Sequence, residues 1–168
     1  YIMPYDAKSV MWQLSFPMSE EEAKALSAKG AQALKEEAIR RINWHEPIPS
    51  ILTATPAQLI SGYPVYDRPL FQADWMKHAG PITLIGDAAH PMSPFKGQGA
   101  NQALLDALAL ARLIYTSSES DIKSHLRERV LTPFEEEMMT RSSVKVKESR
   151  AAAKFLHTDI VLKEGNIT

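Results

Sequence analysis

The sequence predicts an α/β protein, a mixture of helices and short strands, and three observations carry this prediction. Residues 82–85, Ile-Thr-Leu-Ile, have the length and composition of a strand buried on both faces. Residues 10–16 place Val, Trp, Leu and Phe at alternate positions, which is typical of a half-buried strand. Elsewhere, apolar residues recur at the three- and four-residue spacing of amphipathic helices.

The composition narrows the classes of function. The chain has 168 residues, and its 19 basic and 20 acidic side chains are interspersed, so no basic face for nucleic acid or anionic lipid is expected. It contains no cysteine, so any redox chemistry would come from a cofactor. No apolar run reaches the roughly 18 residues of a membrane span, and we expect a soluble, cytoplasmic protein. Because the chain begins at Tyr1, we also expect a longer polypeptide.

The first 64 residues follow the strand with a helix and a proline-rich connection. Ser19 and Glu22 form a capping-box pattern that opens the helix, and Gly30 is expected to divide it in two. Four prolines within residues 44–64 predict an extended connection, with room for one strand at residues 58–60.

The following residues contain the buried strand and a central helix. A brief β-prone piece is expected at residues 65–66, before the strand at 82–85. Residues 98–115 predict a helix that is apolar nearly all round and is therefore expected to be central.

The last third is expected to be helical. Apolar spacing through Val130 predicts one helix, which Pro133 should end or kink. Thr132 and Glu135 form a second capping-box pattern, with Pro133 at the favoured first position of a helix that reaches about His157. We thus expect three segments: residues 1–64, 65–117 and 118–168.

The most informative stretch runs from Ile82 to Arg112. Asp87 follows the predicted buried strand, at the kind of strand end where ligands collect in open α/β sheets. A carboxylate there accepts hydrogen bonds from the hydroxyls of a sugar or polyol, and Gly86 would let the ligand approach the backbone. The alternative is an ordinary turn in which Asp87 caps a helix.

The loop after Asp87 is stiff and ends in glycines. Gly97 and Gly99 would let the backbone pass close to a flat ligand, and the helix start that follows would stabilise a negative charge. The alternative is a helix start that is satisfied by water. Neither common phosphate loop fits. Gln102 occupies the third glycine position of a dinucleotide fingerprint, and Lys96 comes before the glycine, whereas the lysine of a Walker A loop follows it.

The segment GDAAHPMSPFKGQGANQALLDA, residues 86–107, resembles the second flavin-contacting segment of the FAD-dependent aromatic hydroxylases. These are flavoprotein monooxygenases similar to p-hydroxybenzoate hydroxylase, and the ubiquinone-hydroxylase and tetracycline-inactivating branch is the most similar. The resemblance covers about the last two-thirds of the chain. It implies the C-terminal part of that FAD-binding fold, preceded in residues 1–64 by the end of the substrate-covering sheet domain.

The resemblance also implies roles for individual residues. Asp87 would hold a ribityl hydroxyl of FAD, Gly86 would leave the cofactor room, and Pro94 would lie near the reactive edge of the flavin ring. Backbone N–H groups would face the pyrimidine edge of the ring from four residues: Gly97, Gly99, Ala100 and Asn101. No metal, acid, base or nucleophile is implied.

The implied chemistry has two halves. NAD(P)H would reduce FAD, and the reduced flavin would react with O2 to give a C4a-hydroperoxide that hydroxylates an electron-rich organic substrate. The seven glycines make no G-x-G-x-x-G, so the N-terminal Rossmann βαβ unit of the family is missing. We therefore expect a chain that binds FAD weakly and is inactive without the N-terminal half. The alternatives are a non-enzymatic remnant or subunit that pairs with a separate chain carrying that half, and a generic sugar- or nucleotide-binding module.

Other polar residues carry weaker expectations. Asp67 and Arg68 are expected to form a local ion pair or a solvated turn, and Trp12 to pack between sheet and helix. Three histidines are expected to be structural or solvent-facing: His45, His78 and His90.

Overall fold

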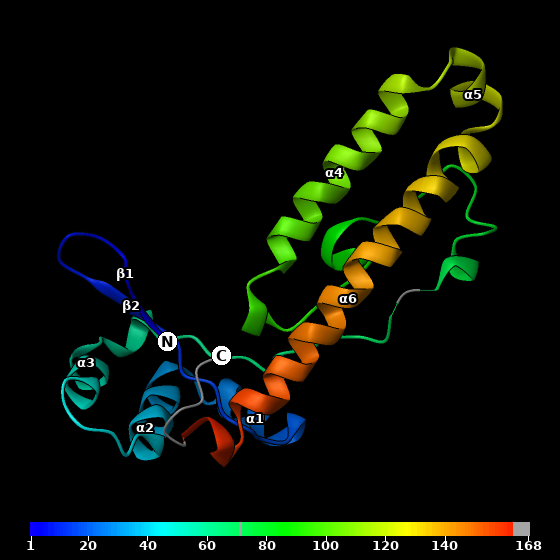
Figure 1. Ribbon diagram of the computed structural model, residues 1–168. Helices are drawn as coiled ribbons and strands as arrows, with labels where there is room; N and C mark the ends of the chain where they lie inside the picture. The colour runs from blue at the N-terminus through cyan, green and yellow to red at the C-terminus, as the bar shows by residue number, and fades with distance from the viewer. Residues whose placement is uncertain (71, 163–168) are drawn as a thin grey trace. The chain divides into compact units, whose positions relative to one another are not determined.

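The computed structural model describes residues 1–70 and 72–162, and it shows helices with one small sheet (Figure 1). The predicted mixed α/β class is confirmed. The chain divides into two compact units, Tyr1–Pro64 and Val65–Thr168. The end of the expected segment 118–168, residues 163–168, lies outside the described residues.

The sheet of the first unit has two strands. β1 (Ile2–Pro4) pairs antiparallel with β2 (Val10–Trp12), with Met3 opposite Met11. The predicted strand at 10–16 is therefore too long, because its partner offers only three residues for pairing. The expected alternation nevertheless persists beyond the ladder, where Leu14 and Phe16 are partly buried and Gln13 and Ser15 are exposed.

Two helices follow, as predicted. α1 (Glu20–Ala28) begins with the expected capping box, in which Glu22 N–H donates to Ser19 Oγ at 3.3 Å and Ser19 N–H donates to Glu22 Oε2 at 3.2 Å. Gly30, with a φ of 86°, separates it from α2 (Ala31–Arg41).

The proline-rich connection is helical, so the prediction of an extended segment with a strand at 58–60 is wrong. The structure has α3 (Ile48–Ala54) and the short 3₁₀ helix η1 (Ala57–Leu59). Pro47 precedes α3 and Pro49 lies in its first turn, where a helix loses no hydrogen bond to a missing N–H. Trp12 packs beside this helix, and its Nε1 donates to Thr55 Oγ1 at 2.9 Å.

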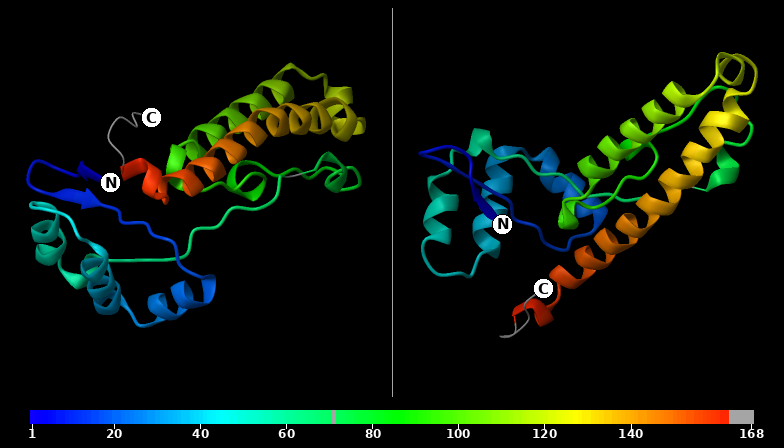
Figure 2. Two further views of the ribbon diagram at one scale, coloured as in Figure 1. Left: turned by 60° about the horizontal axis from the view of Figure 1, so that its bottom comes forward. Right: turned by 45° about the horizontal axis from the view of Figure 1, so that its top comes forward.

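The second unit is built on two long helices, α4 (Gly99–Thr116) and α6 (Thr132–Leu156). They run alongside each other in opposite directions (Figures 1 and 2). Between them lie α5 (Glu119–Ser124) and a π-helical segment, η5 (Arg127–Leu131). Phe134 and Met138 of α6 form the core with Ala89. The short 3₁₀ turns are η2 (Ala73–Trp75), η3 (Gly86–Ala88), η4 (Pro94–Lys96) and η6 (Asp159–Leu162).

Residues 82–85 do not form the predicted buried strand, and residues 65–66 do not form a strand either. Ile82 is 60% exposed and Ile85 is 40% exposed. The described part of the chain gives this segment no strand partner, so its backbone stays extended without a ladder. Arg127 holds it instead: its Nε donates to Gly80 O at 2.9 Å and its Nη2 donates to Ile82 O.

α4 confirms the predicted helix but is covered on one side only. Gln102 and Asp106 are its buried residues, whereas Leu104 is 70% exposed and Leu108 is 46% exposed. Its expected central position is therefore not reached. Across residues 1–70 and 72–162, we find no helix with both the length and the apolar content needed to cross a bilayer.

α6 begins and ends where predicted, but without the second capping box. Leu131 before it is already helical, with φ −75° and ψ −42°, so Thr132 continues a helix and does not cap one. Glu135 turns away to accept hydrogen bonds from Thr83 Oγ1 at 2.6 Å and Arg127 Nη1 at 2.7 Å.

Candidate flavin site

The turn at residues 86–90 leads the chain from the extended segment to the loop before α4. Gly86 has a φ of 57°, and a Cβ built on it would lie 3.2 Å from Ala103 Cβ in α4. Its carbonyl accepts hydrogen bonds from the N–H groups of Ala89 and His90, both at 2.9 Å. The space expected beside Gly86 is thus filled by α4, and a glycine is needed here for the positive φ and the close helix packing.

Asp87 is exposed at the outside of this turn. Its carboxylate has no hydrogen-bond or ion-pair partner within the described residues. A Cβ built on Gly99 would lie 3.8 Å from Asp87 Oδ1, so the carboxylate lies beside the start of α4. The two features that the sequence singled out therefore meet in space.

The loop between Asp87 and α4 contacts α6 and the residue that follows it. Ser93 Oγ donates to Ser149 O at 2.9 Å, and the ring of Phe95 meets the ring of His157 edge-on at 5.1 Å between centroids. Pro94 begins η4 and is exposed. These contacts leave Pro94 on the outer side of a fixed loop.

The first turn of α4 offers backbone donors. The N–H groups of Gly99, Ala100 and Asn101 have no acceptor inside the helix, as at every helix start. Gly97 differs from expectation, because its N–H donates to Pro94 O at 2.9 Å. Its φ of 61° shows that it shapes the turn into α4.

A buried carboxylate behind the turn was not predicted. Asp106 of α4 is fully buried and accepts three hydrogen bonds: Gly86 N–H at 2.8 Å and His90 Nε2 at 2.7 Å on Oδ2, and Arg141 Nη2 at 2.9 Å on Oδ1. Burial raises the pKa of Asp106, but the hydrogen bonds from Gly86, His90 and Arg141 outweigh it and hold the pKa below its usual value.

Arg141 of α6 ties this carboxylate to its surroundings. It also donates to Gln102 Oε1 at 2.8 Å and to both oxygens of Glu137. The carboxylates of Glu137 and Asp106 raise the pKa of Arg141, Glu137 most strongly. The sequence held a signal for this cluster: Gln102 and Asp106 are two polar residues four apart on a mostly apolar helix.

The other polar expectations have mixed outcomes. Asp67 and Arg68 do not pair with each other: Asp67 Oδ2 accepts from Arg150 Nε at 2.6 Å, and Arg68 Nη2 donates to Ala88 O and, at 3.0 Å, to Ala89 O. His90 is buried and structural, whereas the remaining two of the three histidines, His45 and His78, are exposed.

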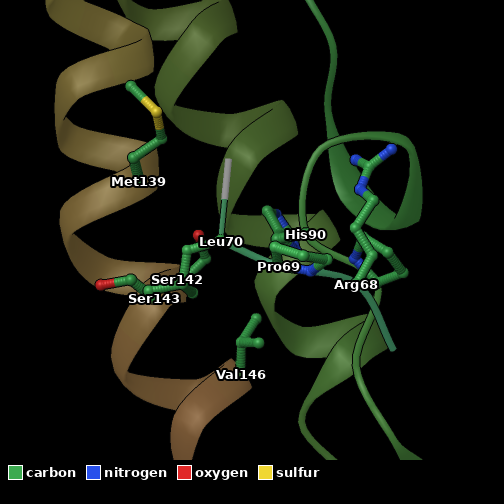
Figure 3. Close-up of a pocket in the computed structure, with 9 residues that line it drawn as sticks. Arg68, Pro69, Leu70, His90, Met139, Ser142, Ser143 and Val146 are labelled. Carbon is green, nitrogen blue, oxygen red and sulfur yellow. The ribbon is translucent and has the colours of Figure 1, made fainter. Parts of the chain in front are cut away.

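A shallow hollow, open to solvent, lies on the α6 side of the turn (Figure 3). Figure 3 shows Arg68 and His90 on one side of it, facing residues of α6 such as Ser142 and Val146. None of the predicted flavin contacts lines this pocket. The candidate site is therefore the outer surface around Asp87 and the start of α4.

Comparison with known proteins identifies the class. Residues 23–119 match the model of the FAD binding domain family, which is more than half of the chain. The chain belongs to this family, as the motif around Asp87 predicted, and its cofactor is FAD.

The individual relatives are monooxygenases by name. The chain is 44% identical over 77 residues to the aurachin C monooxygenase/isomerase of Stigmatella aurantiaca, which covers 45% of this chain and 19% of that protein. It is 32% identical over 124 residues to the FAD-dependent monooxygenase nanF of Aspergillus nanangensis, covering 71% and 26%. It is 30% identical over 146 residues to the FAD-dependent monooxygenase cctM of Talaromyces islandicus, covering 83% and 34%. The chain thus spans about a third or less of the length of these relatives.

Proposed function

We propose that the chain supplies the ribityl-facing and ring-facing part of an FAD site in a monooxygenase. In this proposal the complete enzyme uses NAD(P)H and O2 to hydroxylate an electron-rich organic substrate. The observation that carries it is the exposed Asp87 carboxylate, which has no partner among the described residues. It lies beside the start of α4, where the first N–H groups have no acceptor inside the helix. The monooxygenase names of the relatives support the reaction type.

The residues present fit the cofactor chemically. The Asp87 carboxylate is an acceptor for ribityl hydroxyls, and the N–H groups of Gly99, Ala100 and Asn101 are donors for carbonyl oxygens of a ring. The positive end of the α4 dipole favours negative charge on that ring. When bound, FAD supplies hydride acceptance and oxygen activation.

The remaining predicted contacts take different roles in this proposal. Pro94 flanks the ring from the outer side of its loop, where it is exposed. Gly86 and Gly97 shape the backbone of the site and do not contact the ring. Gly86 permits close packing of α4, and the N–H of Gly97 is already bonded to Pro94 O. The chain's own tasks are to bind the cofactor, to orient it and to stabilise charge on it.

We also propose that the adenine-nucleotide half of FAD binds to polypeptide outside this chain, as a further segment of the same protein. Two observations support this: the seven glycines make no dinucleotide fingerprint, and α4 leaves Leu104 and Leu108 exposed. The chain alone is therefore expected to bind flavin weakly and to hydroxylate nothing.

Titration of the purified chain with flavin, followed by fluorescence quenching, tests the site. Because the chain would contact the ribityl chain and ring, FAD and FMN should bind with similar affinity and ATP should not compete. Asp87→Ala should weaken flavin binding about tenfold through loss of charge-assisted hydrogen bonds. The matched control is Asp74→Ala, an exposed carboxylate in η2, which should bind like the parent.

Two results would contradict the proposal. Equal flavin affinity in the parent and Asp87→Ala would remove Asp87 from the site. Competition by ATP would favour the alternative of a generic nucleotide-binding module.

A further inference from the structure

The buried carboxylate of Asp106 bonds to both ends of the turn that carries Asp87. One of its oxygens, Oδ2, accepts from the N–H of Gly86 at 2.8 Å and from Nε2 of His90 at 2.7 Å. These two residues are the first and last of the five-residue turn. Asp87 directly follows Gly86 in the sequence, so the direction of the Asp87 backbone depends on the position in which Asp106 holds Gly86.

Asp106 cannot act on a ligand directly, since it is fully buried. Its second oxygen, Oδ1, is bonded at 2.9 Å to Arg141, which a two-oxygen contact with Glu137 keeps in place. The carboxylate is therefore oriented from α6 and presents one oxygen to the turn. Without that oxygen, the buried N–H of Gly86 would have no acceptor, which favours a different backbone conformation.

We propose that Asp106 is a positioning residue for the flavin site, oriented by Arg141 and acting through Gly86 and His90 on the placement of Asp87. The inference deepens the proposed function and rests on it for the role of Asp87. The hydrogen bonds that the inference uses belong to the chain itself, so they can be tested without any flavin.

The first test measures amide hydrogen exchange by NMR in the full 168-residue chain. Asp106→Asn should speed exchange of the Gly86 amide about tenfold beyond any change in the amides of α4 and α6, because the charge-assisted bond is lost. It should also shift the amide signals of residues 87–90. The matched control, Glu136→Gln, removes an exposed carboxylate from the same helix as Arg141 and should leave the Gly86 amide unchanged.

Arg141→Gln is the second variant, because Asp106→Asn puts a neutral amide into a buried ionic cluster. It leaves the bond between Gly86 and Asp106 intact but frees Oδ1, so Gly86 exchange should rise by a smaller factor, about threefold. The inference is overturned if the Gly86 amide exchanges in step with the α4 amides in the variants that fold.

The second test is a double-mutant cycle on FMN affinity with Asp106→Asn and Asp87→Ala. If Asp106 acts through Asp87, Asp106→Asn should weaken binding in the parent but have little effect once Asp87 is already alanine. A purely structural role would give equal effects in both backgrounds and would contradict the inference. If the parent itself does not bind FMN, the proposed function fails for this chain, whereas the exchange measurement still decides whether Asp106 positions the turn.

Discussion

At the scale of a single residue, two features of the backbone require glycine at position 86. Gly86 has a positive φ of 57°, and a Cβ built on it would lie only 3.2 Å from Ala103 Cβ. Gly97 has a similar φ of 61°, but a Cβ there would meet no atom within 4 Å. We therefore expect Gly97→Ala to lower the free energy of unfolding by about 1 kcal/mol, the cost of a left-handed conformation.

Gly86→Ala should lower the free energy of unfolding by about 1 kcal/mol more than Gly97→Ala does, because α4 must also shift to make room for the methyl group. Urea denaturation of the two variants measures the difference. Equal losses would show that the close packing of α4 on Gly86 contributes nothing.

The pKa of Asp106 gives a second prediction at this scale. Because its folded-state pKa lies below the usual 3.8, its contribution to stability is present above that pH and is lost as the pH falls through the folded value. Asp106→Asn should therefore destabilise the chain by about 3 kcal/mol at pH 6, and the gap to the parent should narrow toward pH 2.

Denaturant unfolding across this pH range measures the gap. Gln102→Ala is the control: it removes another Arg141 contact without a titrating group, so its cost should not depend on pH. If the difference in stability between the parent and Asp106→Asn stays constant down to pH 2, the pKa of Asp106 is not lowered by folding.

At the scale of elements, the extended segment 82–85 is held by side chains in place of a ladder. Glu135 is the centre of this arrangement, since it is buried and accepts from Thr83 and Arg127. Glu135→Ala would leave Arg127 without its buried partner, and we expect a loss of about 3 kcal/mol in unfolding free energy.

Glu136→Ala is the neighbouring control on the same helix. Its side chain is exposed, so the expected change is within about 0.5 kcal/mol. Thermal or urea unfolding measures both. A cost for Glu135→Ala as small as that of the control would mean that the segment is held by other contacts.

The two capping-box patterns show why local sequence predicts some elements and not others. Ser19 and Glu22 form the box because both are exposed and have no competing partner as close. Thr132 and Glu135 carry the same pattern, but the carboxylate of Glu135 accepts hydrogen bonds from Thr83 and Arg127 instead. Pro47 and Pro49 likewise predict an extended chain, but one directly precedes α3 and the other lies in its first turn, where a helix tolerates proline.

At the scale of the whole molecule, α4 has a side that no described residue covers fully. Leu104 and Leu108 lie four residues apart on it. We expect the isolated chain to associate through this apolar face as its concentration rises. Sedimentation velocity should show the association weaken in a variant that carries both Leu104→Glu and Leu108→Glu.

Leu59→Glu controls for the added charge, since Leu59 is 74% exposed and lies in the other unit. It should leave the association unchanged. A monomeric parent at all concentrations, or an equal effect of the control, would contradict the role of α4.

The sequence predicts outward-facing residues for the candidate site, but it does not predict the buried residues behind them. Asp87, the stiff loop and the glycine-started helix are contiguous in sequence, and their motif matches a known family. Asp106 and Arg141 hold that motif from behind. Arg141 is 35 residues beyond Asp106 on another helix, so only packing brings the two together.

By itself, the sequence determined the family, the cofactor and the positions of the long helices. These features depend on local periodicity and on a contiguous motif, which neighbouring residues specify. Only the tertiary structure decided that residues 82–85 form no ladder, that Gly97 has its N–H already paired, and that Asp106 joins both ends of the turn. Each of these depends on which donors and acceptors meet across the fold, since a buried polar group adopts the geometry that satisfies its hydrogen bonds.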